Sequence, residues 1–407
     1  MMIRSAVLVA SLAALWGCGE GQRATSALKF GAGEHVIIGD RGYLSACGKR
    51  RDCQPSFARA DGIERYSYGE LIAFSADFYE TASEIFRETR EPWYQLFRNN
   101  IDATRKLFQQ EVQAAQNLMD GHNDTEYPDF SKGFALNYRN YINLAEHNED
   151  HFGFYNIKRY VAEHDQALAL AKHAHDLRQQ GDGAADAALR EALFQAAFAD
   201  HFLTDGFASG HIRNPRRQTL AWAESHGYSR RTAAAFSKIL HDRDGEIRES
   251  GEHGLAVRNA RGDEWFARCD AQLFYKNAGD SRAVQLVTEA VEISLDEFFA
   301  AYDSGVLPEG KFPALDLVPY PDEASLSLTD AVRVDRFLPQ KAYDAMAWYM
   351  HPPFVKDFSP GAITGFYKAL PEVMDMMRQD ISTIIDGSPE LAGRLPEAYL
   401  AAYRDIR

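Results

Sequence analysis

The chain has 407 residues, of which 45% are hydrophobic, enough to bury one large core or two moderate ones. Lys and Arg total 44 and Asp and Glu total 59, which gives a net charge of −15 at pH 7. This balance disfavours a protein that binds the nucleic-acid backbone through counterion release, and most of the acidity is expected on the solvated surface.

The first 17 residues have the pattern of an export signal. A basic start at Arg4 precedes an apolar run, Ala6–Trp16, which is too short to cross a bilayer core of about 30 Å as a helix. Leu15-Trp16-Gly17-Cys18 resembles the lipobox of bacterial lipoproteins. We therefore expect export from a bacterial cytoplasm, giving either a periplasmic or outer-membrane lipoprotein acylated at Cys18 or a secreted protein.

The other cysteines divide into a close pair and a single residue. Cys47 and Cys53 flank the short loop GKRRD, and in an oxidising compartment this spacing favours a disulfide. Cys269 is left without a predicted partner.

Apolar residues recur at helical spacing through the middle of the chain and predict an all-α fold. The predicted helices are Ile72–Thr81, Trp93–Asp120, Asn137–Asn148, Ile157–Gln179, Ala184–Asp205, Ser229–Asp242 and Ala283–Tyr302. Strand-like stretches are limited to Val36–Ile38 and Leu255–Val257. Proline becomes frequent after residue 307, so we expect a main helical domain over 18–310, followed by a linker and a helical C-terminal extension over 311–407.

The central motif is His201-x3-Asp205-x5-His211. His201 and Asp205 are one helical turn apart, so both side chains leave the same face and can bind one metal ion. His211 follows the segment GFASG, whose glycines can turn the chain and return a third ligand to the same place. The alternative interpretation is a half-buried histidine that simply pairs with Asp205.

Further candidate ligands flank this motif on both sides. Asp77 lies in LIAFSADFYE, a predicted apolar helix in which a buried carboxylate without a partner would be costly. The others are His35 in GEHVIIGD, His147 and His151 in AEHNEDHF, and His241 with Asp242 and Asp244 in KILHDRDGE.

In this order the residues resemble the zinc-dependent bacterial phospholipases C and the related fungal zinc single-strand nucleases. That family has an early His, an Asp, a His usually followed by Phe, a His-x3-Asp-x5-His, and a final His followed by a carboxylate. The chain offers, in the same order, Glu34-His35, Ala76-Asp77, His151-Phe152, the central motif and His241. The resemblance spans about Gly33 to Asp244 and implies a multi-helix bundle around two or three zinc ions.

The resemblance also implies a ligand set. One zinc would lie between Asp77, His151, His201 and Asp205, and Asp205 would bridge to a second zinc that also uses His35. A third zinc would use His211, His241 and a nearby carboxylate. Imidazole and carboxylate ligands suit zinc sites that keep positions open for water and substrate.

Three features depart from the family. No tryptophan lies shortly before His35 to supply the family's N-terminal amine ligand, and the segment between Asp77 and His151 is longer than in compact members. The family places its last carboxylate where this chain has Gly245, which leaves Asp244 or Glu246 as candidates. Asp244 is preferred because it shares a helical face with His241. His226 is the second choice for the final histidine.

The function implied by the resemblance is that of a zinc-dependent phospholipase C-type hydrolase. Such a metallophosphodiesterase would release glycerophospholipid headgroups through a zinc-activated water, with Asp77 as the catalytic proton acceptor. Its partner would be a phospholipid at a membrane surface, with no nucleic acid favoured and no obligate protein partner. The alternatives are a single-strand nuclease or nucleotidase with the same zinc cluster, or a non-catalytic zinc-binding lipoprotein.

Overall fold

A computed structural model describes residues 31–51, 53–62, 64–87, 100–122, 130–138, 141–245, 254–269, 272–274, 282–329, 339–350 and 355–407. The predicted export signal, Cys18 and Glu246 lie outside these described residues.

Helices dominate the described chain, as predicted, and strands form only two small sheets. The α-helices are α2 (Ala32–Cys47), α3 (Tyr68–Phe74), α4 (Ala82–Arg87), α6 (Ile101–Met119), α7 (Ser131–Asn137), α8 (Tyr141–Glu146), α9 (Phe154–Gln179), α10 (Ala185–Asp205), α11 (Ser209–Ile212), α12 (Arg216–Ser225), α13 (Arg230–Asp244), α14 (Arg282–Ser304), α16 (Pro339–Met350), α17 (Pro360–Gly387), α18 (Pro389–Arg394) and α19 (Glu397–Asp405). The 3₁₀ helices are η1 (Glu149–His151), η3 (Pro313–Asp316) and η4 (Glu323–Ser325), and the strands are β1 (Phe57–Ala58), β2 (Arg65–Tyr66), β3 (Leu255–Arg258), β4 (Glu264–Ala267) and β5 (Tyr320–Pro321).

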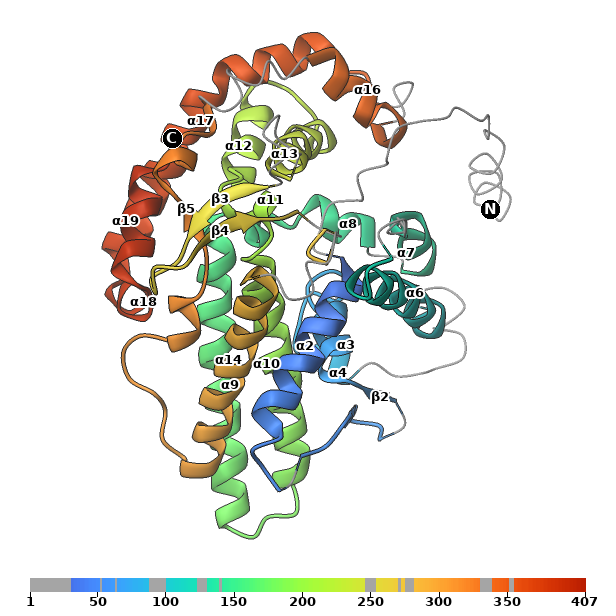
Figure 1. The fold of residues 1–407 in the computed structure, drawn as a ribbon, viewed down its shortest axis with the longest axis vertical. Coiled ribbons are helices and arrows are strands. Elements are labelled where there is room, and N and C mark those ends of the chain that lie inside the picture. Colours follow the sequence, from blue (N-terminus) through green and yellow to red (C-terminus); the bar gives the residue numbers. More distant parts are fainter. Residues whose placement is uncertain are drawn as a thin grey trace.

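The long antiparallel helices α9 and α10 form the axis of the molecule, and α14 and α2 pack beside them (Figure 1). Helix α10 is buried on every side from Ala192 to Asp205, which is the pattern of a central core helix. Its alanines favour helix formation and let neighbouring backbones approach closely. The end of α10 that carries His201 and Asp205 is therefore fixed deep inside the protein.

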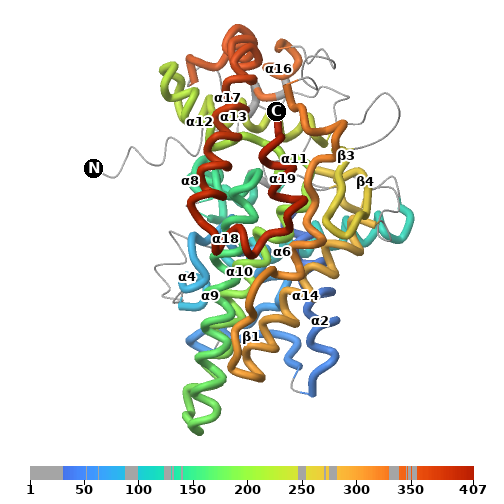
Figure 2. The backbone as a smooth tube through the Cα atoms, turned by 90° about the vertical axis from the view of Figure 1, so that its left-hand side faces the viewer, coloured from blue at the N-terminus to red at the C-terminus, as the bar shows by residue number. Residues whose placement is uncertain are grey.

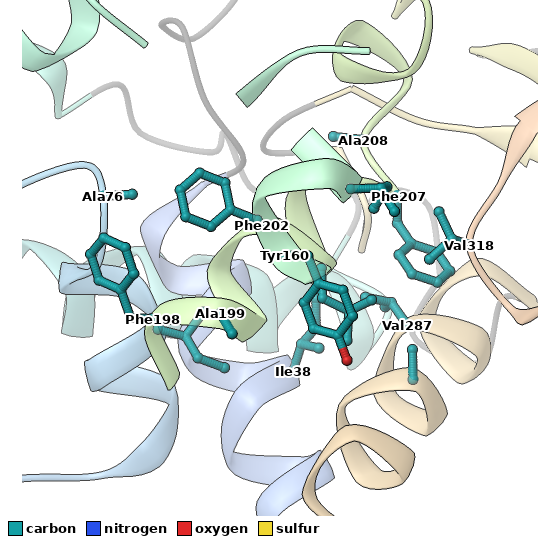
Figure 3. Packing of buried hydrophobic residues seen from close by; sticks show 14 of the residues in the cluster. Ile38, Ala76, Tyr160, Phe198, Ala199, Phe202, Phe207, Ala208, Val287 and Val318 are labelled. Atoms are coloured by element: carbon teal, nitrogen blue, oxygen red, sulfur yellow. The ribbon is translucent and has the colours of Figure 1, made fainter. Parts of the chain in front are cut away.

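Figure 3 shows how apolar side chains close the interior around α10. Phe198, Ala199 and Phe202 of α10 pack among residues from other helices, including Ile38 of α2 and Val287 of α14. All of these side chains are buried. Because the interior is close-packed, the helices that carry the candidate ligands are held in one arrangement.

Helices α2 and α3 cross at very short range. A Cβ atom added to Gly69 would lie 2.0 Å from the carbonyl oxygen of Val36, and one added to Gly39 would lie 2.7 Å from the Cα of Gly69. Glycine at both positions is therefore required by the close approach of the two backbones. This crossing brings the segment after α3 close to the start of α2.

The C-terminal helices share the main hydrophobic core with the elements that carry the site. Phe366 of α17 stacks on Phe236 of α13, with ring centroids 4.7 Å apart. Tyr403 of α19 donates a hydrogen bond of 2.5 Å to the carbonyl of Ile212. Figure 2 shows α17, α18 and α19 lying along one side of the molecule, against α9, α12 and α13.

Strand β3 pairs antiparallel with both β4 and β5. A small apolar cluster of Leu255, Val257, Ala267 and Ile212 attaches this sheet to α11. The predicted strand at Leu255–Val257 is therefore confirmed. No helix among the described residues is long and apolar enough to cross a membrane.

Two predicted elements are wrong. Val36–Ile38 lies inside α2, where the helix buries one apolar face, and does not form a strand. The helix predicted over Ile72–Thr81 ends at Phe74, because the backbone is extended at Ser75.

The disulfide prediction is confirmed. The sulfur atoms of Cys47 and Cys53 are bonded across a six-residue separation, and Cys269 is buried.

Candidate metal centre

His201 is oriented by the backbone of α3. Its Nδ1 lies 3.0 Å from the carbonyl oxygen of Ile72, and because a carbonyl only accepts, Nδ1 carries the proton. Burial lowers the pKa of His201 to about 3, so the ring is neutral and Nε2 presents a lone pair. That nitrogen lies 3.5 Å from Asp77 Oδ1 and 3.5 Å from Asp205 Oδ2.

His35 is oriented through Thr204. The Thr204 hydroxyl donates to the carbonyl of Asp200 at 2.8 Å, so it accepts the hydrogen bond of 2.9 Å from His35 Nδ1. The lone pair of His35 is then on Nε2, which lies 3.4 Å from Asp205 Oδ1. The rings of His35 and His201 are stacked, with centroids 4.7 Å apart.

Asp77 lies in a tight turn after α3 and not, as predicted, inside a helix. Ala76 has a φ of 56°, which makes it the one described non-glycine residue with a positive φ. This sparsely populated conformation is the kind of local strain that clusters at functional sites. The turn directs Asp77 Oδ1 to within 3.5 Å of Nε2 of both His151 and His201.

His151 ends the short helix η1 and is tied to α11 by two hydrogen bonds. Its carbonyl accepts from His211 Nδ1 at 2.9 Å, and the Gly153 N–H donates to the carbonyl of His211 at 2.5 Å. Gly153 has a φ of 61°, a conformation that glycine adopts without cost. A candidate ligand from before α9 is thereby placed beside candidate ligands from α10.

Asp205 lies between the two sets of imidazoles. One of its oxygens faces His35 and the other faces His201, and neither accepts a hydrogen bond among the described residues. Burial alone would raise the pKa of this carboxyl, but the adjacent imidazoles of His211 and His201 outweigh burial and hold the pKa well below its usual value. Asp205 is therefore an ionised carboxylate inside the protein.

These residues form two buried groups that could hold a metal ion: His35, His201 and Asp205, and Asp77, His151 and His201. Two ligand atoms bound tetrahedrally to one zinc at about 2.0–2.1 Å lie roughly 3.4 Å apart. The nitrogen-to-oxygen distances of 3.4 to 3.5 Å match that separation. Lone pairs and carboxylate oxygens that face one another in this way are stabilised by a cation between them.

Solvent reaches the two groups unequally. Asp77 and His151 are each 4% exposed, whereas His35, His201 and Asp205 are 0% exposed. The Asp77 side is therefore the less deeply buried of the two.

His211 and His241 form an outer pair beside these groups. Nδ1 of His211 lies 3.5 Å from Asp205 Oδ2 but donates its hydrogen bond to the His151 carbonyl. The ring of His241 lies 5.2 Å from that of His211, and its Nδ1 donates to Asp242 Oδ1 at 2.9 Å. In each ring Nδ1 is therefore the donor, an arrangement that is also found in ligating histidines. Neither histidine belongs to the two groups that could hold a metal ion.

Asp244 does not take the role predicted for it. Its two oxygens accept hydrogen bonds of 2.8 and 2.6 Å from Nε and Nη2 of Arg213, and both side chains are buried. A bidentate pair with a guanidinium occupies the oxygens that a metal would need. His226, the second choice for the final histidine, stacks on Trp222 and bonds to its carbonyl, so it serves the packing of α12.

One contributor was not found from the sequence. Thr204, on the helix that carries His201, orients His35 and gives no signal of its own.

Comparison of the chain with family models, curated proteins and solved structures gives no match in any of the three. The functional interpretation therefore depends on the geometry of these side chains.

Proposed function

We propose that the protein is a zinc-dependent phosphodiesterase of phospholipase C type that acts on glycerophospholipids. The observation that carries this proposal is that Asp77, His151, His201, Asp205 and His35, from four separate segments, face one another at ligand-to-ligand distances. The rings of His201 and His35 are fixed so that Nε2 is the nitrogen directed at the carboxylates.

In this proposal Asp77, His151, His201 and Asp205 hold one zinc, and His35 and Asp205 hold a second. Asp205 is suited to bridging because its two oxygens face different imidazoles. Bound zinc would lower the pKa of a water molecule and neutralise charge on the phosphate oxygens. A third zinc at His211 and His241 completes the proposed set.

Asp77 is assigned the role of proton acceptor. Its Oδ1 faces His151 and His201, and a carboxylate has a second oxygen that can accept a proton from the attacking water. It also lies on the side of the site that solvent reaches. Burial of the other ligands excludes bulk water and strengthens the electrostatic interactions at the phosphate.

A phospholipid is favoured over single-stranded nucleic acid because the chain has a net charge of −15. Proteins that track single strands combine a basic groove with aromatic platforms, and the sequence has no basic stretch interleaved with aromatic residues. Export directed by residues 1–17, with acylation at Cys18 or secretion, belongs to the same proposal and would place the enzyme near membrane lipids.

The test compares hydrolysis of a phosphatidylcholine analogue, a phosphatidylethanolamine analogue and denatured DNA by the purified protein, with zinc and after chelation. We expect zinc-dependent release of a phosphorylated headgroup and no cleavage of DNA. Cleavage of DNA alone would contradict the substrate class. Failure to cleave any phosphodiester in the presence of added zinc would contradict the enzymatic proposal.

A further inference from the structure

Thr204 is buried on the last turn of α10, directly before Asp205. Its hydroxyl oxygen lies 2.8 Å from the carbonyl oxygen of Asp200 and 3.0 Å from that of His201, so its one proton is directed at the helix backbone. The hydroxyl therefore presents a lone pair to Nδ1 of His35, which lies 2.9 Å away.

The two stacked imidazoles differ in what accepts their Nδ1 proton. His201 Nδ1 donates to the backbone carbonyl of Ile72, which remains in place whatever side chain stands at position 72. His35 Nδ1 donates to a side-chain hydroxyl, which a substitution of Thr204 would remove. The orientation of His201 is therefore a property of the backbone, whereas that of His35 depends on one side chain.

The position of the proton on His35 decides whether Nε2 can bind a cation. Nε2 of His35 lies 3.4 Å from Asp205 Oδ1. A neutral imidazole carries one ring proton, so with that proton on Nδ1 the Nε2 lone pair and the carboxylate oxygen face each other across a place for a cation. With the proton on Nε2, the same two atoms would form a hydrogen bond and the lone pair would be lost to a metal.

The second metal site depends on His35 more than the first depends on any single histidine. His201 belongs to both groups of candidate ligands but has one nitrogen for a metal, because its Nδ1 carries a proton. An ion beside Asp77 and His151 that takes Nε2 of His201 leaves His35 and Asp205 of the other group for the second ion.

We infer that Thr204 is a positioning residue: its hydroxyl keeps the proton of His35 on Nδ1 and thereby makes the second metal site, at His35 and Asp205, available. This inference rests on the proposed zinc centre and deepens it, because it names the side chain on which one of the two sites depends. Loss of a hydrogen-bond partner behind a ligating histidine typically lowers metal affinity by about 10- to 100-fold.

The first measurement is the tautomer of each imidazole in the metal-free protein, read from its nitrogen chemical shifts by NMR. We expect the proton on Nδ1 in both His35 and His201. In Thr204→Val, which keeps the shape of the side chain but removes the hydroxyl, the proton of His35 should move to Nε2 while that of His201 stays on Nδ1. Thr204→Ser should restore the wild-type tautomer of His35.

The second measurement is a calorimetric titration with zinc. Thr204→Val should bind one zinc equivalent about 10- to 100-fold more weakly than the wild type and bind the rest with unchanged affinity. Thr204→Ser should recover the lost affinity. Thr219→Val is the matched control: Thr219 is a buried threonine of α12 whose hydroxyl has no hydrogen-bond partner among the described residues, so the tautomers and all zinc affinities should stay as in the wild type.

The outcomes separate this inference from the proposed zinc centre. A proton on Nε2 of His35 in the metal-free wild type would overturn the role of Thr204, and so would a zinc titration of Thr204→Val that matches the wild type. Weakening of every zinc equivalent in Thr204→Val, with no recovery in Thr204→Ser, would indicate a packing defect and would overturn it too. If the wild type binds no zinc, the proposed zinc centre fails and the inference fails with it.

Discussion

Helix α10 carries two buried aspartates with opposite environments. Asp200 accepts hydrogen bonds from the Tyr68 hydroxyl at 2.8 Å and from the Ser294 hydroxyl at 2.6 Å. Asp205, one and a half turns later, accepts none among the described residues and faces imidazoles on both sides. The same residue type on one helix is therefore placed in a hydroxyl network in one case and, in the other, in a group of side chains that could hold a metal ion.

The ionisation of the two carboxyls follows the same division. Burial raises the pKa of Asp200 to about 6, against the lowering effect of its hydrogen bonds to Ser294 and Tyr68. At Asp205 burial is outweighed by the neighbouring imidazoles and the pKa falls. A buried aspartate thus indicates a metal site only when its neighbours leave its oxygens to a cation; burial alone does not distinguish the two roles.

The largest expected effect is that of Asp205→Asn. An amide cannot provide two anionic oxygens, so we expect loss of more than one bound zinc and of most phosphodiesterase activity. Metal analysis of the dialysed protein provides the measurement. Loss of a single zinc with activity retained would contradict a bridging carboxylate.

Asp77→Asn should have the second largest effect on activity. Removal of a proton acceptor costs about 10² to 10⁴ in rate, and the zinc between Asp77, His151 and His201 should bind more weakly. Turnover of a phosphatidylcholine analogue at saturating zinc separates the loss of the acceptor from the loss of metal. Wild-type turnover at saturating zinc would show that Asp77 is only a weak ligand.

Asp200→Asn sharpens the contrast because it should alter stability and not metal content. Both hydroxyl donors lose a carboxylate acceptor, at a cost of about 1–3 kcal/mol in the free energy of unfolding. Equilibrium denaturation of the variant gives this cost, and metal analysis should show the wild-type stoichiometry. If Asp200→Asn lost zinc as Asp205→Asn does, the division between the two aspartates would be wrong.

The difference in the free energy of unfolding between wild type and Asp200→Asn should depend on pH in a definite direction. Since the pKa of Asp200 is raised to about 6 in the folded protein, the native state binds an extra proton as pH falls from about 6 to about 4. The carboxyl group of Asp200 therefore adds to the free energy of unfolding at low pH, and this contribution is lost as the pH rises through about 6. In the chelated protein, the stability difference between wild type and Asp200→Asn should be larger at pH 4 than at pH 7.

A smaller effect is expected at Ala76. Its positive φ is unfavourable for alanine, so Ala76→Gly should raise the free energy of unfolding by about 1 kcal/mol, with the position of Asp77 unchanged. Thermal unfolding of the chelated protein measures this gain. A marked loss of stability would mean that the turn is not strained.

His173→Ala should leave stability, zinc content and activity unchanged. His173 is an exposed histidine on α9, and surface substitutions of this kind change stability by less than about 0.5 kcal/mol. Zinc content and phosphodiesterase activity should equal those of the wild type. A large loss of either would show that the ligand set is misassigned.

The sequence predicted the parts of the structure that depend on local patterns. The helical fold, the disulfide and the shared face of His201 and Asp205 all follow from residue spacing. The turn at Asp77 does not, because it depends on a positive φ at Ala76 that no local residue preference signals. The partner of Asp244 is Arg213, 31 residues away, and i+3 spacing from His241 carries no information about that contact.

Crystallographic anomalous scattering at the zinc edge, from zinc-loaded protein, tests the central claim most directly. The account predicts a peak bounded by Asp77, His151 and His201, at about 2.0–2.1 Å from Nε2 of both histidines, and a second peak between His35 and Asp205. A zinc-loaded crystal with no anomalous peak among these residues would contradict it.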